Sequence, residues 1–146
     1  GGGKILQVVS YDGNINRVSS ASATYVATGT SIAITPAAST SKILIFMGGT
    51  NAHGYGNSRF TLYRDINGGG FSDVSGGEGI YYGNTDSWVP GAGSMLDSPS
   101  TTSECTYEVY IKNTSGGTVI WGGNSSVSDD SLPTNGVYLV AFEVGA

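Results

Sequence analysis

The chain has 146 residues and a formal net charge of −5 at pH 7. This length suits one domain with a single core, and 24 glycines with only 12% charged residues suit short strands joined by tight turns. The six basic residues are scattered along an acidic chain, so nucleic acid is not an expected ligand. No apolar stretch approaches the roughly 18 residues that a membrane span needs, which excludes membrane insertion from the expected functions.

The first three residues differ from the rest of the chain in their capacity to pack. Residues 1–3 are all glycine and are predicted to be the remnant of a flexible linker, although a cloning remnant would look the same. Residues 4–146 contain apolar runs throughout, without a repeat of fixed period. They are predicted to form a single β-sandwich domain.

Strand patterns recur along the whole chain. Apolar or alternating runs bounded by Gly, Pro, Ser or Asn predict strands. In chain order these are residues 4–10, 24–27, 31–35, 42–47, 58–66, 71–74, 94–96, 104–112, 118–121 and 137–144. Their number is typical of two packed sheets, so the expected fold is an all-β antiparallel sandwich, jelly-roll-like.

Turn residues and polar segments separate the predicted strands. Asp12-Gly13, Asn67-Gly68 and Asn135-Gly136 each supply a residue that tolerates positive φ beside a strand end. Residues 48–57, 76–93 and 122–135 have no strand character and are predicted to be loops. Loops on a rigid scaffold commonly carry function, so binding residues are sought there first.

Alternation identifies the inward face of one central strand. Within residues 104–112, Cys105, Tyr107, Val109 and Ile111 share one face, which is predicted to be buried. Cys105, the only cysteine, is therefore expected to act as a small hydrophobic residue, and an internal disulfide is impossible.

The last predicted strand is apolar on both faces. One face carries Val137, Leu139 and Ala141, and the other carries Tyr138, Val140, Phe142 and Val144. One face can line the core, whereas the other needs cover from a strand, a loop or another subunit. Glu143 departs from the pattern and is predicted to mark where solvent begins.

The sequence contains no recognisable catalytic centre. His53 is the only histidine, and the spacing of Glu78, Asp86, Asp97 and Asp129-Asp130 selects no pair of carboxylates for glycoside hydrolysis. An enzyme is therefore not expected.

A metal site is not predicted either. Residues 12–16 resemble the start of a calcium loop, but Arg17 replaces the glycine at the sixth position and Ala23 the glutamate at the twelfth. No metal and no cofactor are expected.

Aromatic and polar residues are concentrated in the first two predicted loops. The candidate ligand-binding residues are His53, Tyr55, Tyr81, Tyr82, Asp86 and Trp88. Rings amid Gly, Asn, Ser and Asp suit a sugar, through stacking and hydrogen bonds, and they equally suit a protein surface. The alternative is that the rings pin a long loop to the sandwich.

The order of segments carries a resemblance to a known family. The relevant segments are residues 1–9, 31–36, 41–45, 60–64, 96–99, 106–107 and 116–119, with the closing hydrophobic strand. Together they resemble the C-terminal tip domains of tail fibre and other virion surface proteins of tailed bacteriophages. The resemblance implies a homotrimer at the virion surface, exposed at the fibre tip and contacting a bacterial surface glycan or outer-membrane protein.

Three functions therefore remain in consideration. The first is a receptor-binding domain at a fibre tip, the second a structural knob that trimerises a fibre, and the third a polysaccharide-cleaving enzyme. Binding to cells separates the first from the second, and release of product from host polysaccharide would identify the third.

Overall fold

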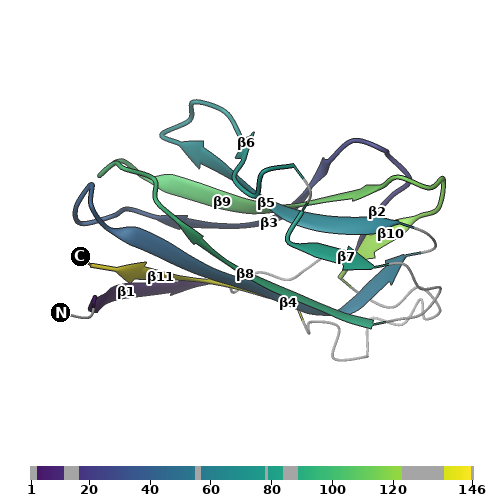
Figure 1. Cartoon of the computed structure of the whole chain (residues 1–146), viewed down its shortest axis with the longest axis horizontal. Coiled ribbons are helices and arrows are strands. Elements are labelled where there is room, and N and C mark those ends of the chain that lie inside the picture. The colour runs from purple at the N-terminus through teal and green to yellow at the C-terminus, as the bar shows by residue number, and fades with distance from the viewer. Residues whose placement is uncertain are drawn as a thin grey trace.

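The computed structural model of the chain describes residues 3–11, 17–54, 57–77, 79–83, 89–122 and 137–145, with the backbone alone for residues 49–54 and 89–91. Within these ranges the chain is all-β, and its strands form two antiparallel sheets packed as a sandwich (Figure 1). No helix in the described ranges is long and apolar enough to cross a membrane.

The first sheet contains six strands. Its main part has the order β1 (Ile5–Ser10), β11 (Tyr138–Val144), β4 (Lys42–Gly54) and β8 (Val89–Asp97). The short strands β10 (Val119–Trp121) and β2 (Val18–Ser20) extend the sheet where β10 pairs with the end of β4. The 13-residue strand β4 therefore holds the sheet together, since three strands pair with it.

The second sheet contains five strands. β3 (Val26–Ile34), β9 (Cys105–Asn113) and β5 (Ser58–Ile66) lie side by side. The short strands β6 (Ser72–Asp73) and β7 (Tyr81–Gly83) share the outer edge of β5. The two sheets form two layers, and in Figure 1 β9 and β5 lie in the layer above β4 and β8.

Two of the predicted loops contain strands, which corrects the prediction that they have no strand character. β4 continues through residues 48–54, and residues 76–93 contain β7 and the first part of β8. These segments are rich in glycine and show no apolar period, so pairing rather than propensity makes them extended. Gly48 has a packing reason, because a Cβ there would lie 2.6 Å from the ring of Tyr138 on the neighbouring strand.

Two smaller differences concern bulges and short strands. The predicted strands 24–27 and 31–35 are one strand, β3, interrupted by a register shift at Gly29, whose φ is +76°. β2 and β7 were not predicted, because three residues carry too little pattern. The turns at Asp12-Gly13 and Asn135-Gly136, and residues 123–135 of the third predicted loop, lie outside the described residues.

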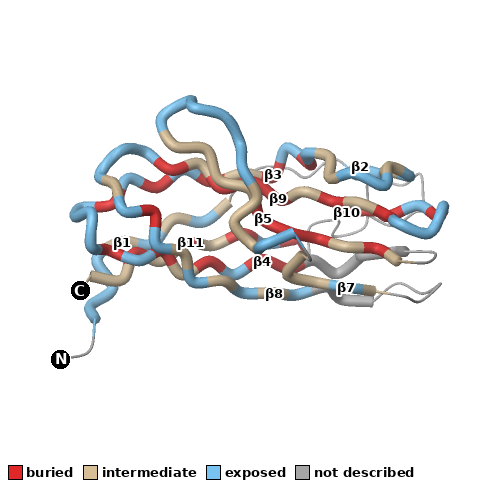
Figure 2. The backbone as a smooth tube through the Cα atoms, turned by 45° about the horizontal axis from the view of Figure 1, so that its top comes forward, coloured by how far each residue is buried: buried red, intermediate tan, exposed pale blue. Residues whose placement is uncertain are grey.

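The core is the apolar layer between the two sheets. Cys105, Tyr107, Val109 and Ile111 of β9 are fully buried, as their alternation predicts. They share one core with Ile43, Ile45, Met47, Leu139, Ala141 and Trp121 of the first sheet and with Phe60 and Leu62 of the neighbouring strand β5. Figure 2 shows this arrangement as buried residues alternating with more exposed ones along the strands. The Nε1 of Trp121 donates a hydrogen bond to the hydroxyl of Thr30, so the one polar atom of the largest core side chain is satisfied.

Glu143 lies in the core, and the prediction that it marks the start of solvent is wrong. Its carboxylate is fully buried, and it accepts hydrogen bonds from Nε2 of Gln7 at 2.6 Å and from the backbone N–H of Ala37 at 2.7 Å. Burial opposes ionisation, but these hydrogen bonds outweigh it and lower the pKa of the Glu143 carboxyl. The carboxylate thus connects β11 to β1 and to the segment between β3 and β4.

The lowered pKa of Glu143 predicts acid sensitivity. A depressed folded-state pKa contributes stability above the unfolded value of 4.5, and that stability is lost as the pH falls through the folded pKa. We expect Glu143→Gln to cost about 1–3 kcal/mol at pH 7 and to flatten the decline in stability below pH 4.5. Urea unfolding at pH values from 7 to 3 measures this, and an unchanged acid decline in the variant would contradict it.

Candidate functional site

Of the predicted binding residues, the structure describes His53 in β4 and Tyr81 and Tyr82 in β7. Ser58 of β5 lies opposite Gly83 of β7, and Ala52 of β4 lies opposite Val89 of β8. His53 belongs to β4, where its backbone lies opposite Ile120, and its side chain is outside the description. The residues Tyr55, Asp86 and Trp88 also lie outside the described ranges, so their roles stay predictions.

The two neighbouring tyrosines of β7 have opposite environments. Tyr81 packs against the core, with its ring centroid 5.2 Å from that of Phe60. Tyr82 is 52% exposed, and its hydroxyl donates a hydrogen bond to Oδ1 of Asn57 at 2.6 Å. Strand alternation separates them, so Tyr81 acts as a structural pin whereas Tyr82 is available at the surface.

Tyr82 begins a row of side chains that crosses the second sheet. In the strand register Tyr82 lies opposite Arg59 of β5, and Arg59 lies opposite Lys112 of β9. The guanidinium of Arg59 is 5.4 Å from the centroid of the Tyr82 ring, and Nζ of Lys112 is 4.1 Å from that of Tyr25, the residue before β3. We call these four residues, Tyr82, Arg59, Lys112 and Tyr25, the cation row. Two cations flanked by two rings are thereby held on one outward face.

A second pair of rings continues this face away from the cation row. Tyr63 of β5 and Tyr110 of β9 stack with centroids 3.9 Å apart and planes 15° from parallel, and Tyr25 meets Tyr63 edge-on at 5.9 Å. Burial first, and then the charge of Asp73, raises the pKa of Tyr63. Burial and then Glu108 raise the pKa of Tyr110. Both hydroxyls are therefore neutral at pH 7 and able to donate or accept hydrogen bonds.

Three carboxylates on this side of the sheet accept hydrogen bonds from backbone amides. Glu108 accepts from the N–H of Gly29, Asp73 from that of Ser75, and Asp65 from those of Gly68 and Gly70. Chemically, the face combines flat rings for apolar stacking with cationic and hydroxyl donors. This is the combination that a saccharide or a polar protein surface can use.

Sequence reasoning missed Arg59, Lys112 and Tyr25. The basic residues are scattered in the sequence, but the fold brings Arg59 and Lys112 directly opposite each other. The sequence did contain one indication of this face. Strand alternation places Lys112 with Tyr110, and Arg59 with Tyr63, on the outward side of their strands. What the sequence did not supply is the register that aligns the two strands.

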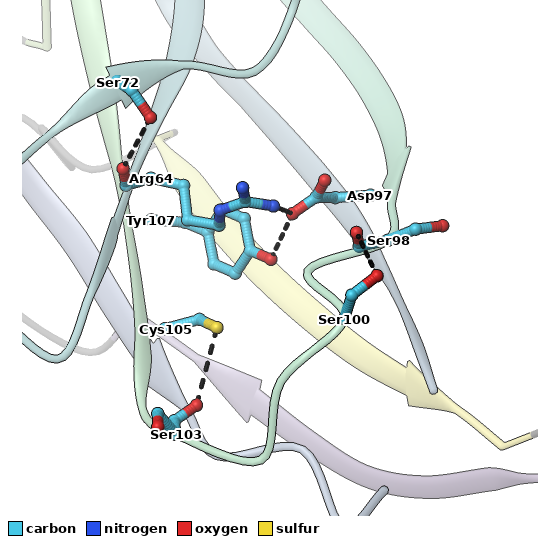
Figure 3. A network of polar contacts seen from close by, with 8 residues as sticks. All are labelled: Arg64, Ser72, Asp97, Ser98, Ser100, Ser103, Cys105 and Tyr107. Carbon is cyan, nitrogen blue, oxygen red and sulfur yellow. Dashed lines mark hydrogen bonds and ion pairs between the residues drawn. The ribbon is translucent and has the colours of Figure 1, made fainter. Parts of the chain in front are cut away.

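A second polar cluster lies inside the sandwich and connects its two sheets. Asp97, at the end of β8, accepts hydrogen bonds from the guanidinium of Arg64 on β5 and from the hydroxyl of Tyr107 on β9 at 2.6 Å (Figure 3). Burial opposes the charge of Arg64, but the hydrogen bond and charge of Asp97 outweigh it and raise the pKa of the guanidinium. Burial and the bond to Asp97 raise the pKa of Tyr107 far above its usual range.

Cys105 lies beside this cluster but is poorly suited to nucleophilic chemistry. Its thiol faces the carbonyl of Ser103 at 3.6 Å, and burial raises its pKa. A buried thiol with a raised pKa is a weak nucleophile. Among the described residues no group of three or more His, Cys, Asp or Glu side chains could hold a metal ion. The arrangement is that of a structural tie between sheets.

Comparisons with known proteins add no family assignment. No protein-family profile matches the chain, and no curated protein matches it significantly in sequence.

The Asp97 cluster predicts a graded stability series. Asp97→Asn leaves the charge of Arg64 without its carboxylate in a mostly buried site, so we expect a loss of about 2 kcal/mol in the free energy of unfolding. Tyr107→Phe removes one hydrogen bond and keeps the ring, so about 1 kcal/mol is expected. Urea unfolding measures both, and a smaller loss for Asp97→Asn than for Tyr107→Phe would contradict the ion-pair role.

Proposed function

We propose that this domain is the receptor-binding tip of a bacteriophage tail fibre, exposed at the virion surface, and that it works as a homotrimer. The observation that carries the proposal is the different chemistry of the two outer faces of the sandwich. The first sheet has an apolar outer face suited to assembly. The second sheet has a face of rings and cations suited to recognition.

The strand order supports a jelly-roll protomer. The main part of the first sheet runs β1-β11-β4-β8, and the second sheet runs β3-β9-β5 followed by β6 and β7 at one edge. Consecutive strands thus alternate between the sheets from β3 to β9, except for the short pieces at that edge. Eight strands wound in this way form the two Greek keys of a jelly roll.

The outer face of the first sheet supports self-association. Val8, Phe142, Leu44 and Leu96 form one cross-strand row over four strands, and Val140 and Phe46 lie opposite each other in the next row. We call these six residues the apolar outer face. Val8 and Leu96 are 54% and 53% exposed, and Phe46 is 40% exposed. Side chains of this size in adjacent rows form a patch larger than single scattered surface hydrophobics, and such patches mark interaction sites.

In a threefold arrangement, the apolar outer face of each subunit divides into two halves that contact different neighbours. The half on β1 and β11 carries Val8, Val140 and Phe142, and the half on β4 and β8 carries Leu44, Phe46 and Leu96. In a trimer the first half of one copy packs on the second half of the next, which closes a ring with identical contacts. Each contact is expected to bury at least about 800 Å² per subunit.

The assembly predicts a specific response to a buried charge. The chain should have the mass of a trimer by light scattering at micromolar concentration, and Leu96→Glu should shift it toward monomer, because each trimer would bury three carboxylates. Ala33→Glu, which adds the same charge to the exposed outer side of the second sheet, should remain trimeric. A monomeric wild-type protein, or equal behaviour of the two variants, would contradict the proposal.

The receptor half of the proposal rests on the cation row and the neighbouring Tyr63 and Tyr110. If the apolar outer face is covered by neighbouring subunits, the second sheet is directed away from the threefold axis and toward the surroundings. A purely structural knob does not require an exposed aromatic ring. The ring of Tyr82 is nevertheless exposed, hydrogen-bonded to Asn57 and next to Arg59. A polysaccharide-cleaving enzyme would additionally need a pair of catalytic carboxylates, whereas Glu108 and Asp73 of this face accept hydrogen bonds from backbone amides.

Binding can be tested with the labelled trimer on a panel of bacterial strains and on an array of their surface glycans. Retention on a subset of strains is expected. Tyr82→Ala should weaken that binding about tenfold by removing a stacking ring, whereas Tyr82→Phe keeps the ring and should retain most of it. Trimer mass and melting temperature serve as controls for folding. No retention on any strain would favour the structural knob, and product release would favour the enzyme.

A further inference from the structure

The turn between β5 and β6 contains a chemically reactive pair of residues in a protected geometry. We propose that Asn67-Gly68 is a deamidation site, and that the carboxylate of Asp65 holds it unreactive in the folded protein. The site takes no part in the proposed receptor or subunit contacts. It lies within residues 65–70, where the acceptors of four successive backbone N–H groups are known.

The sequence of this turn favours deamidation. The backbone N–H of Gly68 gives up its proton to a base in solution, and its nitrogen bonds to the side-chain amide carbon of Asn67. The amide nitrogen takes up a proton from solvent and leaves as ammonia, and water then hydrolyses the resulting succinimide to aspartate or isoaspartate. Glycine leaves the attacking nitrogen unhindered because it has no Cβ, and both residues are exposed to water.

The geometry of the turn opposes this attack. Asn67 and Gly68 have φ values of +52° and +77°, and the N–H of Gly69 donates to the carbonyl of Ile66 at 3.1 Å. Two central residues with positive φ define a type I′ turn. In that turn the nitrogen of Gly68 lies roughly trans to the Cβ of Asn67 about the Cα–C bond. The peptide plane must therefore rotate before the nitrogen can reach the side-chain carbon.

Asp65 opposes both this rotation and the loss of the proton. Its Oδ1 accepts a hydrogen bond from the N–H of Gly68 at 2.7 Å, and its Oδ2 accepts one from the N–H of Gly70 at 2.9 Å. Hydrogen bonds to a charged acceptor are the stronger kind, and a neighbouring negative charge disfavours the amide anion that the reaction needs. The N–H of Asn67 donates to the carbonyl of Glu104 at 3.0 Å, which also anchors the turn to the segment before β9.

The reaction would disturb the edge of the second sheet. Isoaspartate carries the main chain through the former side chain and so lengthens the backbone by one methylene within the turn. Just beyond the turn, Tyr63 pairs with Asp73 and Arg64 with Ser72. The register of a hairpin is fixed by its turn, so we expect the modified chain to lose the pairing of β5 with β6.

The experiment compares the folded full chain with the same chain unfolded in guanidinium chloride, at one temperature and one mildly alkaline pH. Conversion of Asn67 to aspartate and isoaspartate is followed by tandem mass spectrometry of the peptide that trypsin releases after Arg64. The folded chain should react at least about tenfold more slowly, because the turn must first open against hydrogen bonds to a charged group. Equal rates in the two states would overturn the proposal.

Variants isolate the role of Asp65. Asp65→Ala should raise the rate in the folded chain about tenfold, and Asp65→Asn, which keeps one acceptor without the charge, should lie between it and the wild type. Asp73→Ala is the matched control, because Asp73 accepts from the backbone N–H of Ser75 at the same edge, and it should react like the wild type. Circular dichroism checks folding, and the comparison uses Asp65→Asn if the alanine variant is unfolded. A folded Asp65 variant that reacts no faster than Asp73→Ala would contradict the role of Asp65.

Discussion

The whole structure depends on the packing of β9 between its neighbours and against the first sheet. Its alternate residues from Cys105 to Ile111 are fully buried, and no disulfide assists them because Cys105 is the only cysteine. Since strand side chains alternate strictly, burying this face directs Thr106, Tyr110 and Lys112 outward. The core thus determines which residues form the outer face of the second sheet.

Polar groups inside the sandwich add orientation to this packing. Asp97 joins the end of β8 to Arg64 and Tyr107 of the opposite sheet, and buried Glu143 joins β11 to Gln7 of β1. Both carboxylates have hydrogen-bonded partners, as buried charge requires. The Asp97 contacts restrict how the two sheets lie on one another, because hydrogen bonds need particular distances and angles.

The two outer faces follow from the same alternation, and they are the basis of the proposed assembly and recognition. On the first sheet the outward phase is apolar over four strands, from Val8 to Leu96. On the second it contains tyrosines and two opposed cations. Because the faces lie on opposite sides of the core, covering one by neighbouring subunits leaves the other accessible. The proposed subunit contact and the proposed receptor contact therefore use different surfaces.

The sequence by itself determined the all-β class, most of the strands, the buried face of β9 and the doubly apolar last strand. Each depends on local composition and period, which a strand carries with it. Only the tertiary structure decided that residues 48–54 and 89–93 are strand, that Glu143 is buried, and that Arg59 faces Lys112. These features depend on which residues lie opposite one another across strands distant in sequence. Register arises from the packing of the whole sandwich, and no local pattern contains it.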